Sequence, residues 1–169
     1  MGKIHFEPAF SILHLVKFSR VETLLHKLKC KIQPEKGVFL GELYGKRLKR
    51  VIEHIDIIIP IPIHINKLRK RGYNQAAQFA FGLSLGLDIL LDENILKRDV
   101  LSISYTQKSR TERYNNVKGV FSVSITRNLQ EKHILLVDDV LTTGASICEA
   151  AQLLIYKGTK VSIATIGRE

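Results

Sequence analysis

The chain has 169 residues, of which 45% are hydrophobic, and this composition predicts one soluble globular domain with a core of ordinary size. Its longest apolar run, Ile57 to Ile63, contains two prolines and is too short to cross a bilayer, so we expect no membrane insertion. The N-terminal residues lack the apolar core of a signal peptide, which makes a cytoplasmic location the expectation. A net charge of +10 suits nucleic acid or phosphorylated metabolites as partners, and it also suits a basic surface that is only solvated.

Residues 1–54 are predicted to be helical. Ser19 to Glu22 form a capping box, and the residues that follow carry an apolar stripe with helical spacing. Residues 33–37 contain a proline and a glycine, which indicate a turn. A second helix is expected from about Val38 to Ile52.

From residue 55 onward, short apolar runs alternate with segments of helical periodicity. The expected strands cover Asp56–Ile61, Asp88–Leu91, Val120–Ile125, Ile134–Val137 and Lys160–Ile166. The expected helices cover Tyr73–Leu85 and Ile147–Lys157, and Gly158 stands where a helix stop is expected. This order favours an α/β fold in which right-handed crossovers join a mostly parallel sheet, within a single domain of residues 1–169.

The two cysteines, Cys30 and Cys148, stand far apart, and neither belongs to a C-x-x-C pair. The sequence therefore offers no zinc-binding pattern. The histidines likewise show no metal-ligand spacing. We predict no metal site made by protein side chains alone.

Two adjacent carboxylates, Asp138 and Asp139, end the apolar run Ile134 to Val137, which is typical of a strand buried on both faces. Open α/β sheets bind ligands at the carboxyl ends of their strands, so we expect both side chains to reach a site there. Paired acids in this position also occur in Mg²⁺ sites of nucleotide hydrolases and in phospho-acceptor domains. The sequence contains neither a G-x-x-x-x-G-K-[ST] loop nor a G-x-G-x-x-G loop.

A short turn with hydroxyl groups follows the acid pair. It comprises Thr142, Thr143, Gly144, Ala145 and Ser146, and a helix is expected directly after it. Glycine lets the backbone approach a ligand closely, and the free N–H groups of a helix N-terminus favour an anion. Acids beside such a turn predict a ligand with both sugar hydroxyls and a phosphate.

Two cation-rich segments accompany these residues. The first follows the expected strand Asp56–Ile61 and contains Lys67, Arg69, Lys70 and Arg71. A basic loop at the carboxyl edge of a sheet is suited to a diphosphate, although a basic helix start without a ligand role has the same composition. The second, Lys97 to Lys118, has few large apolar residues and is too long for an ordinary connection, which is typical of a functional loop or a mobile surface loop.

The string Val137-Asp-Asp-Val-Leu-Thr-Thr-Gly-Ala-Ser146 resembles the phosphoribosyl-pyrophosphate (PRPP) signature of type I phosphoribosyltransferases. Within that superfamily, the chain is most similar to the competence-associated ComF-type proteins, and the resemblance covers about residues 12–169. The strings that support the subgroup are Pro60-Ile-Pro62, Arg71-Gly-Tyr-Asn-Gln75, Thr106-Gln107 and Arg113-Tyr-Asn-Asn-Val117. ComF-type proteins typically carry an N-terminal zinc module with four cysteines, which is missing from this sequence.

The resemblance implies a type I phosphoribosyltransferase fold, in which residues 1–54 form a small helical cap on an α/β core of residues 55–169. It implies that Asp138 and Asp139 hold the ribose hydroxyls and that residues 142–146 bind the 5-phosphate. The diphosphate is assigned to the first cationic segment and to a catalytic loop within Lys97 to Lys118. The residues proposed for this role are Lys67, Arg69 and Arg71 of the former and Lys108, Arg110 and Arg113 of the latter, with Arg98 as a weaker candidate.

The implied activity is transfer of the phosphoribosyl group from PRPP to a nitrogen nucleophile with release of pyrophosphate. Mg²⁺ would be coordinated mainly by PRPP and water. The alternative is a non-catalytic PRPP- and nucleic-acid-binding protein of DNA uptake or processing, which would bind single-stranded DNA through its basic face. A homodimer is a further expectation, because many members of the superfamily dimerise. The residues of the expected cap do not identify the acceptor.

Overall fold

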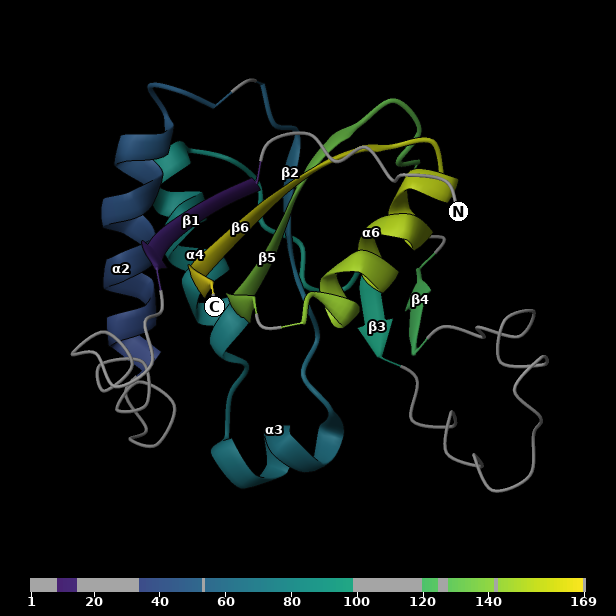
Figure 1. Cartoon of the computed structure of the whole chain (residues 1–169), viewed down its shortest axis with the longest axis horizontal. Helices are drawn as coiled ribbons and strands as arrows, with labels where there is room; N and C mark the ends of the chain where they lie inside the picture. The colour runs from purple at the N-terminus through teal and green to yellow at the C-terminus, as the bar shows by residue number, and fades with distance from the viewer. Residues whose placement is uncertain are drawn as a thin grey trace.

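The computed structural model describes residues 9–14, 34–52, 54–98, 120–124, 128–141 and 143–168. Within these ranges, four strands form one sheet in which every neighbouring pair is parallel (Figure 1). The order across the sheet is β1 (Ala9–His14), β6 (Lys160–Arg168), β5 (His133–Leu141) and β2 (Ile57–Pro60). The prediction of a parallel α/β sheet is therefore confirmed, with β5 and β6 at its centre.

Helices lie on both sides of this sheet (Figure 1). On one side are α4 (Gln75–Leu87) and, packed along it, α2 (Pro34–Leu48). On the other side are α6 (Ala145–Tyr156) and an antiparallel ribbon of β3 (Leu96–Arg98) and β4 (Phe121–Val123). None of the helices in the described part of the chain combines the length and apolar character that crossing a membrane requires.

Strand alternation divides the core between the two faces of the sheet. Successive side chains of a strand point to opposite faces, and in β5 Leu135 and Val137 pack with Phe79 of α4. Ile134 and Leu136 belong to the core on the α6 side. All four β5 side chains are fully buried, which explains why this strand is continuously apolar in sequence.

α2 and α4 approach each other closely at glycines. The positions that face each other are Gly37 with Gln78, Gly41 with Gly82, and Gly45 with Gly86. The numbering increases in the same direction along both helices, so the two helices are parallel. A Cβ atom added to Gly82 would lie 2.0 Å from the carbonyl oxygen of Val38, so the two backbones are in direct contact there.

The prediction that residues 1–54 are helical is wrong for Ala9–His14, which form the edge strand β1. In this strand, Ala9 lies opposite Ile163 and Leu13 lies opposite Gly167 of β6. The second predicted helix exists as α2 and begins earlier than expected, at Pro34, a residue that is well tolerated in the first turn of a helix.

Two predictions around β2 also need correction. The basic segment after β2 was expected to be a loop, but it contains the short helix α3 (Ile65–Arg71), none of whose residues is buried. The predicted strand Asp88–Leu91 is not present, because Asp88 is the left-handed C-cap of α4, with a φ angle of 62°. Leu91 alone makes an isolated parallel bridge, to Ile58 of β2.

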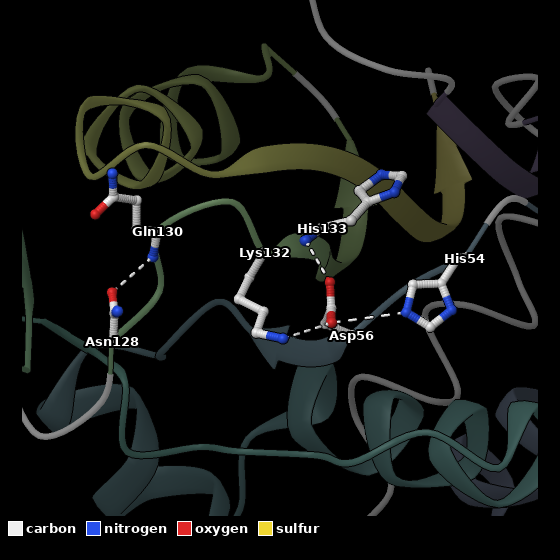
Figure 2. Close-up of polar contacts among 6 residues, drawn as sticks. All are labelled: His54, Asp56, Asn128, Gln130, Lys132 and His133. Carbon is white, nitrogen blue, oxygen red and sulfur yellow. Dashed lines mark hydrogen bonds and ion pairs between the residues drawn. The ribbon is translucent and has the colours of Figure 1, made fainter.

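A polar cluster joins β2 to β5 at the amino end of the sheet (Figure 2). The Asp56 carboxylate accepts hydrogen bonds from the backbone N–H of His133 at 2.8 Å and from Nζ of Lys132 at 2.9 Å. His54 Nε2 lies 3.6 Å from the same carboxylate. The hydrogen bond from the His133 N–H, followed by that from Lys132, holds the pKa of Asp56 below its usual value. The ionised carboxylate therefore stabilises the folded state.

We expect the Asp56→Asn substitution to lower the free energy of unfolding at neutral pH by about 1 kcal/mol, because a charged acceptor of two hydrogen bonds is lost. The folded-state pKa lies below the unfolded value of about 3.9, so this contribution is complete above that value and disappears as the pH falls through the folded-state pKa. Urea denaturation of both proteins at about pH 7 and about pH 3 measures the effect. A difference that stayed the same at both pH values would contradict the role of the charge.

Candidate functional site

The carboxyl ends of β2 and β5 lie side by side. Pro60 is paired with Val137, and just beyond this pair the N–H of Ile61 donates to the carbonyl oxygen of Val137 at 2.8 Å. The segment that follows β2 and the acid pair of β5 therefore leave the sheet at neighbouring points. This is the edge at which open parallel sheets bind ligands.

A pocket of about 260 Å³ opens at this edge. Its walls come from the segment between β2 and the start of α4, from the end of β5 with the start of α6, and from β3. The polar and charged residues that line it are His64, Lys67, Arg71, Asn74, Gln75, Arg98, Asp138, Asp139, Thr143 and Ser146. The pocket thus brings together the acid pair, the hydroxyl turn and part of the first cationic segment, which stand far apart in sequence.

The backbone that follows each acid fixes its carboxylate. Asp138 Oδ1 accepts a hydrogen bond from the N–H of Asp139 at 2.8 Å, and Asp139 Oδ1 accepts one from the N–H of Val140 at 2.8 Å. Both acidic residues are half-buried. Ionised carboxylates only accept hydrogen bonds, so this pair suits donors such as sugar hydroxyls or the water shell of a Mg²⁺ ion.

The turn before α6 leaves a helix N-terminus open toward the pocket. Gly144 is the N-cap with a φ angle of 71°, and it has no side chain to cap the helix. The hydrogen bond from the Cys148 N–H to the Gly144 oxygen closes the first helical turn. The N–H groups of residues 145–147 come before this turn closes, so the helix itself supplies no acceptor for them. Thr143 Oγ1 lies 3.5 Å from the Ala145 nitrogen, which is a weak contact. Ala145 and Ser146 also line the pocket, and an anion is favoured at such a helix end.

The short helix α3 points part of the first cationic segment toward the pocket. Its N-cap is His64, whose ring accepts a hydrogen bond from the N–H of Asn66 at 3.2 Å. Lys67 and Arg71 are four residues apart, lie on one face of the helix and line the pocket. Arg69 lies two residues from each and does not line the pocket, so this placement does not support its assignment to the diphosphate.

Asn74 and Gln75 line the pocket, although neither is among the site residues predicted from the sequence. Asn74 caps α4 by accepting from the N–H of Ala76 at 3.2 Å, and its Nδ2 donates to the Ile61 oxygen at 2.9 Å. The side chain of Gln75 accepts a hydrogen bond from Arg71. These contacts tie the start of α4 to the end of β2 and orient Arg71. The string Arg71-Gly-Tyr-Asn-Gln75 contains a signal for this helix start, because an Asn directly before a helical segment is a common N-cap.

The ribbon of β3 and β4 contributes Arg98 to the pocket. Its guanidinium carbon lies 5.3 Å from the ring centroid of Phe121, the residue opposite it in the ribbon. This distance is typical of a cation–π contact. From the sequence, Arg98 is only a weaker candidate for the diphosphate.

Several predicted residues lie outside the described ranges. They are Lys108, Arg110, Arg113 and Thr142, and their roles stay predictions. Of the expected cap, residues 9–14, 34–52 and 54 are described, and none of them lines the pocket. The described residues also contain no group of three His, Cys, Asp or Glu side chains placed to hold a metal ion.

Residues 70–168 match the family model described as the phosphoribosyl transferase domain. The chain belongs to the phosphoribosyltransferase family. The matched range of this phosphoribosyltransferase domain begins at the end of α3 and contains the acid pair, the hydroxyl turn and Arg98. Lys67 precedes it, as does the whole of α2.

Curated proteins similar to this phosphoribosyltransferase chain confirm its resemblance to competence-associated members. Competence protein F of Haemophilus influenzae is 39% identical over 108 residues, which cover 62% of this chain and 46% of that protein. DNA utilization protein YhgH of Escherichia coli strain K12 is 28% identical over 151 residues, which cover 89% of this chain and 63% of that protein. The chain thus spans less than two thirds of the length of these two relatives.

Solved structures confirm the type I phosphoribosyltransferase fold. The glutamine PRPP amidotransferase of B. subtilis, complexed with ADP and GMP, is similar with a TM-score of 0.51 and 18% identity. The match covers 75% of this chain and 26% of that chain. At this level of identity, the likeness extends to the fold alone.

Proposed function

We propose that this phosphoribosyltransferase-family protein binds PRPP in the pocket and transfers its phosphoribosyl group to a nitrogen nucleophile, with release of pyrophosphate. The proposal rests on one observation: a single pocket contains an acid pair, a helix N-terminus with a glycine cap, and two cations of α3. These features suit ribose hydroxyls, a phosphomonoester and a diphosphate, respectively. PRPP combines these three groups.

In the proposed complex, Asp138 and Asp139 accept hydrogen bonds from the ribose hydroxyls. The N–H groups of residues 145–147 and the hydroxyls of Thr143 and Ser146 hold the 5-phosphate. Lys67 and Arg71 neutralise the diphosphate. Mg²⁺, when bound, adds positive charge at the diphosphate, and the acid pair is suited to hold its water shell.

The reaction exchanges one bond at the ribose C1 atom for another. The nitrogen lone pair forms the new bond to C1 while the C1–O bond to pyrophosphate breaks, and its electron pair leaves with pyrophosphate. The nucleophile then releases its proton to solvent. The protein contributes mainly by positioning the two reactants and by placing cations where negative charge develops on the leaving group.

Calorimetric titration with PRPP and Mg²⁺ tests the binding step. A pyrophosphate-release screen over nucleobases, ammonia and glutamine tests the transfer step and identifies the acceptor. PRPP-dependent pyrophosphate release with one of these acceptors is the expected result. Absence of PRPP binding would overturn the proposal, whereas binding without release by any acceptor would reduce it to a PRPP-binding role.

We expect Lys67→Met to weaken the binding of pyrophosphate by at least about threefold, because a cation that lines the pocket loses its charge. Arg69→Met is the matched control, since Arg69 comes from the same helix but does not line the pocket. Calorimetry with Mg²⁺ and pyrophosphate measures both variants. Equal weakening in the two variants would show that only the general charge of α3 matters.

A second proposed function is binding of single-stranded DNA by the basic surface around α3. Arg69 and Lys70 are exposed on this helix and do not line the pocket, so they are accessible to a second anion. The names of the relatives in competence and DNA utilization favour this class of partner. The logarithm of the affinity should fall with the logarithm of the salt concentration, with a slope of about −0.7 for each phosphate contacted. No DNA binding at low salt would exclude this function.

A further inference from the structure

Arg98 places a guanidinium group in the wall of the pocket that also contains Asp138 and Asp139. It lines the pocket, and among the residues that the structure describes it makes neither a salt bridge nor a hydrogen bond through its side chain. Its Nε atom is shielded from solvent and has no hydrogen-bond partner in the described part of the chain. The contact with the Phe121 ring places the guanidinium group but supplies no acceptor for its N–H donors.

A guanidinium with an unpaired N–H at the wall of a pocket is suited to an anionic ligand. A buried N–H donor without an acceptor is costly, and Nε of Arg98 is such a donor. The planar fork of N–H donors matches the oxygens of a phosphate group. An anion in the pocket would supply the acceptors that the protein does not.

The ribbon that carries Arg98 is attached to α6. Phe121, which pairs with Arg98 in the ribbon, belongs to a buried cluster that contains Ile147 of α6 and also Ile61 at the end of β2. In addition, the backbone N–H of Val120 donates to Glu149 Oε1 of α6 at 2.6 Å. Figure 1 shows the ribbon beside α6, while α3 follows β2 at a separate place below the sheet. Arg98 is therefore carried by a ribbon that is anchored on α6, the helix whose N-terminal residues line the same pocket.

We propose that Arg98 binds the 5-phosphate of the substrate, together with the N-terminus of α6, and so makes the site selective for phosphorylated pentoses. This rests on the proposed function, because it assigns one part of the same ligand. It differs from the sequence-based assignment of Arg98 to the diphosphate. Lys67 and Arg71 remain at the diphosphate, and the two phosphate groups of the ligand are held from different sides.

Separate probes for the two ends of the ligand test this assignment. Ribose 5-phosphate carries only the phosphomonoester end, and pyrophosphate with Mg²⁺ represents the other end. For Arg98→Met, titration of the full chain should show affinity for ribose 5-phosphate reduced by about tenfold, because a charge-assisted hydrogen bond is lost. Affinity for pyrophosphate should stay within about twofold of the wild-type value. Lys67→Met is the mirror control and should affect pyrophosphate alone.

Arg98→Lys keeps the packing stem and the charge while removing the fork of donors. It should lose several-fold less affinity for ribose 5-phosphate than Arg98→Met, and it serves in place of that variant if Arg98→Met does not fold. A loss of pyrophosphate affinity with unchanged ribose 5-phosphate affinity would overturn the assignment in favour of the diphosphate. Unchanged affinity for both probes would show that Arg98 binds no ligand. Failure of the wild-type protein to bind either probe would instead reject the proposed function itself.

Discussion

The Asp139→Asn variant should bind PRPP at least about tenfold more weakly than the wild-type protein, with little change in its thermal unfolding. A hydrogen bond to a charged group contributes about 1.5–3 kcal/mol, which corresponds to about a tenfold to hundredfold change in affinity. The amide side chain of this variant would keep an oxygen for the N–H of Val140, so the local backbone contact of 2.8 Å survives. Calorimetric titration with PRPP and Mg²⁺ gives the affinity, and thermal denaturation gives the stability.

Asp56→Asn is the matched control for this variant. Asp56 lies at the opposite, amino end of the sheet, where it links β2 to β5 through Lys132 and His133. The Asp56→Asn variant should therefore have a lower free energy of unfolding and an unchanged affinity for PRPP. This is the reverse of the effect expected for Asp139→Asn. Unchanged PRPP affinity in Asp139→Asn would remove this carboxylate from the site.

The Gly82→Ala substitution should destabilise the fold by about 3 kcal/mol, which is at the upper end of the usual cost of overpacking. The added Cβ would lie 2.0 Å from the carbonyl oxygen of Val38 and 2.8 Å from the nitrogen of Glu42. Both are backbone atoms of a neighbouring helix, so no side-chain rotation can relieve the clash. Urea denaturation measures the change in the free energy of unfolding.

Gly37→Ala is the matched control on the same helix contact. Its added Cβ would lie 3.2 Å from the Cβ atom of Gln78, a contact that a small shift relieves. Alanine also favours a helix over glycine by about 1 kcal/mol, so this variant should be close to neutral or slightly more stable. If both alanine variants were equally stable, the close parallel packing of α2 against α4 would be wrong.

The central strands and their acids could be predicted because their signals are local. A continuous apolar run identifies Ile134–Val137 without any knowledge of its neighbours, and the helix after the turn follows from its periodicity. The predicted strand Val120–Ile125 is also confirmed in part as β4, Phe121–Val123. The site at the carboxyl edge then follows from the general rule for parallel sheets.

The remaining features depend on contacts that local sequence does not show. The strand Ala9–His14 exists because β6 offers it a partner, and that partner lies at the far end of the chain. α3 buries none of its residues, so it has no apolar stripe to reveal it. The place of Arg98 depends on the packing of β3 and β4 against α6, which brings together residues on either side of a long segment.

The position of β6 has a consequence for folding during synthesis. This strand lies between β1 and β5, although it is made from residues 160–168. Among the described strands, β1 pairs only with β6. On the ribosome this pairing must wait until β6 has emerged from the exit tunnel, whereas β2, α4 and β5 can already associate. Pairing across such a sequence separation is slow and leaves strand edges exposed in the meantime. The sheet should therefore close only after translation of β6, and a nascent chain arrested before residue 160 should leave the amides of β1 unprotected from hydrogen exchange.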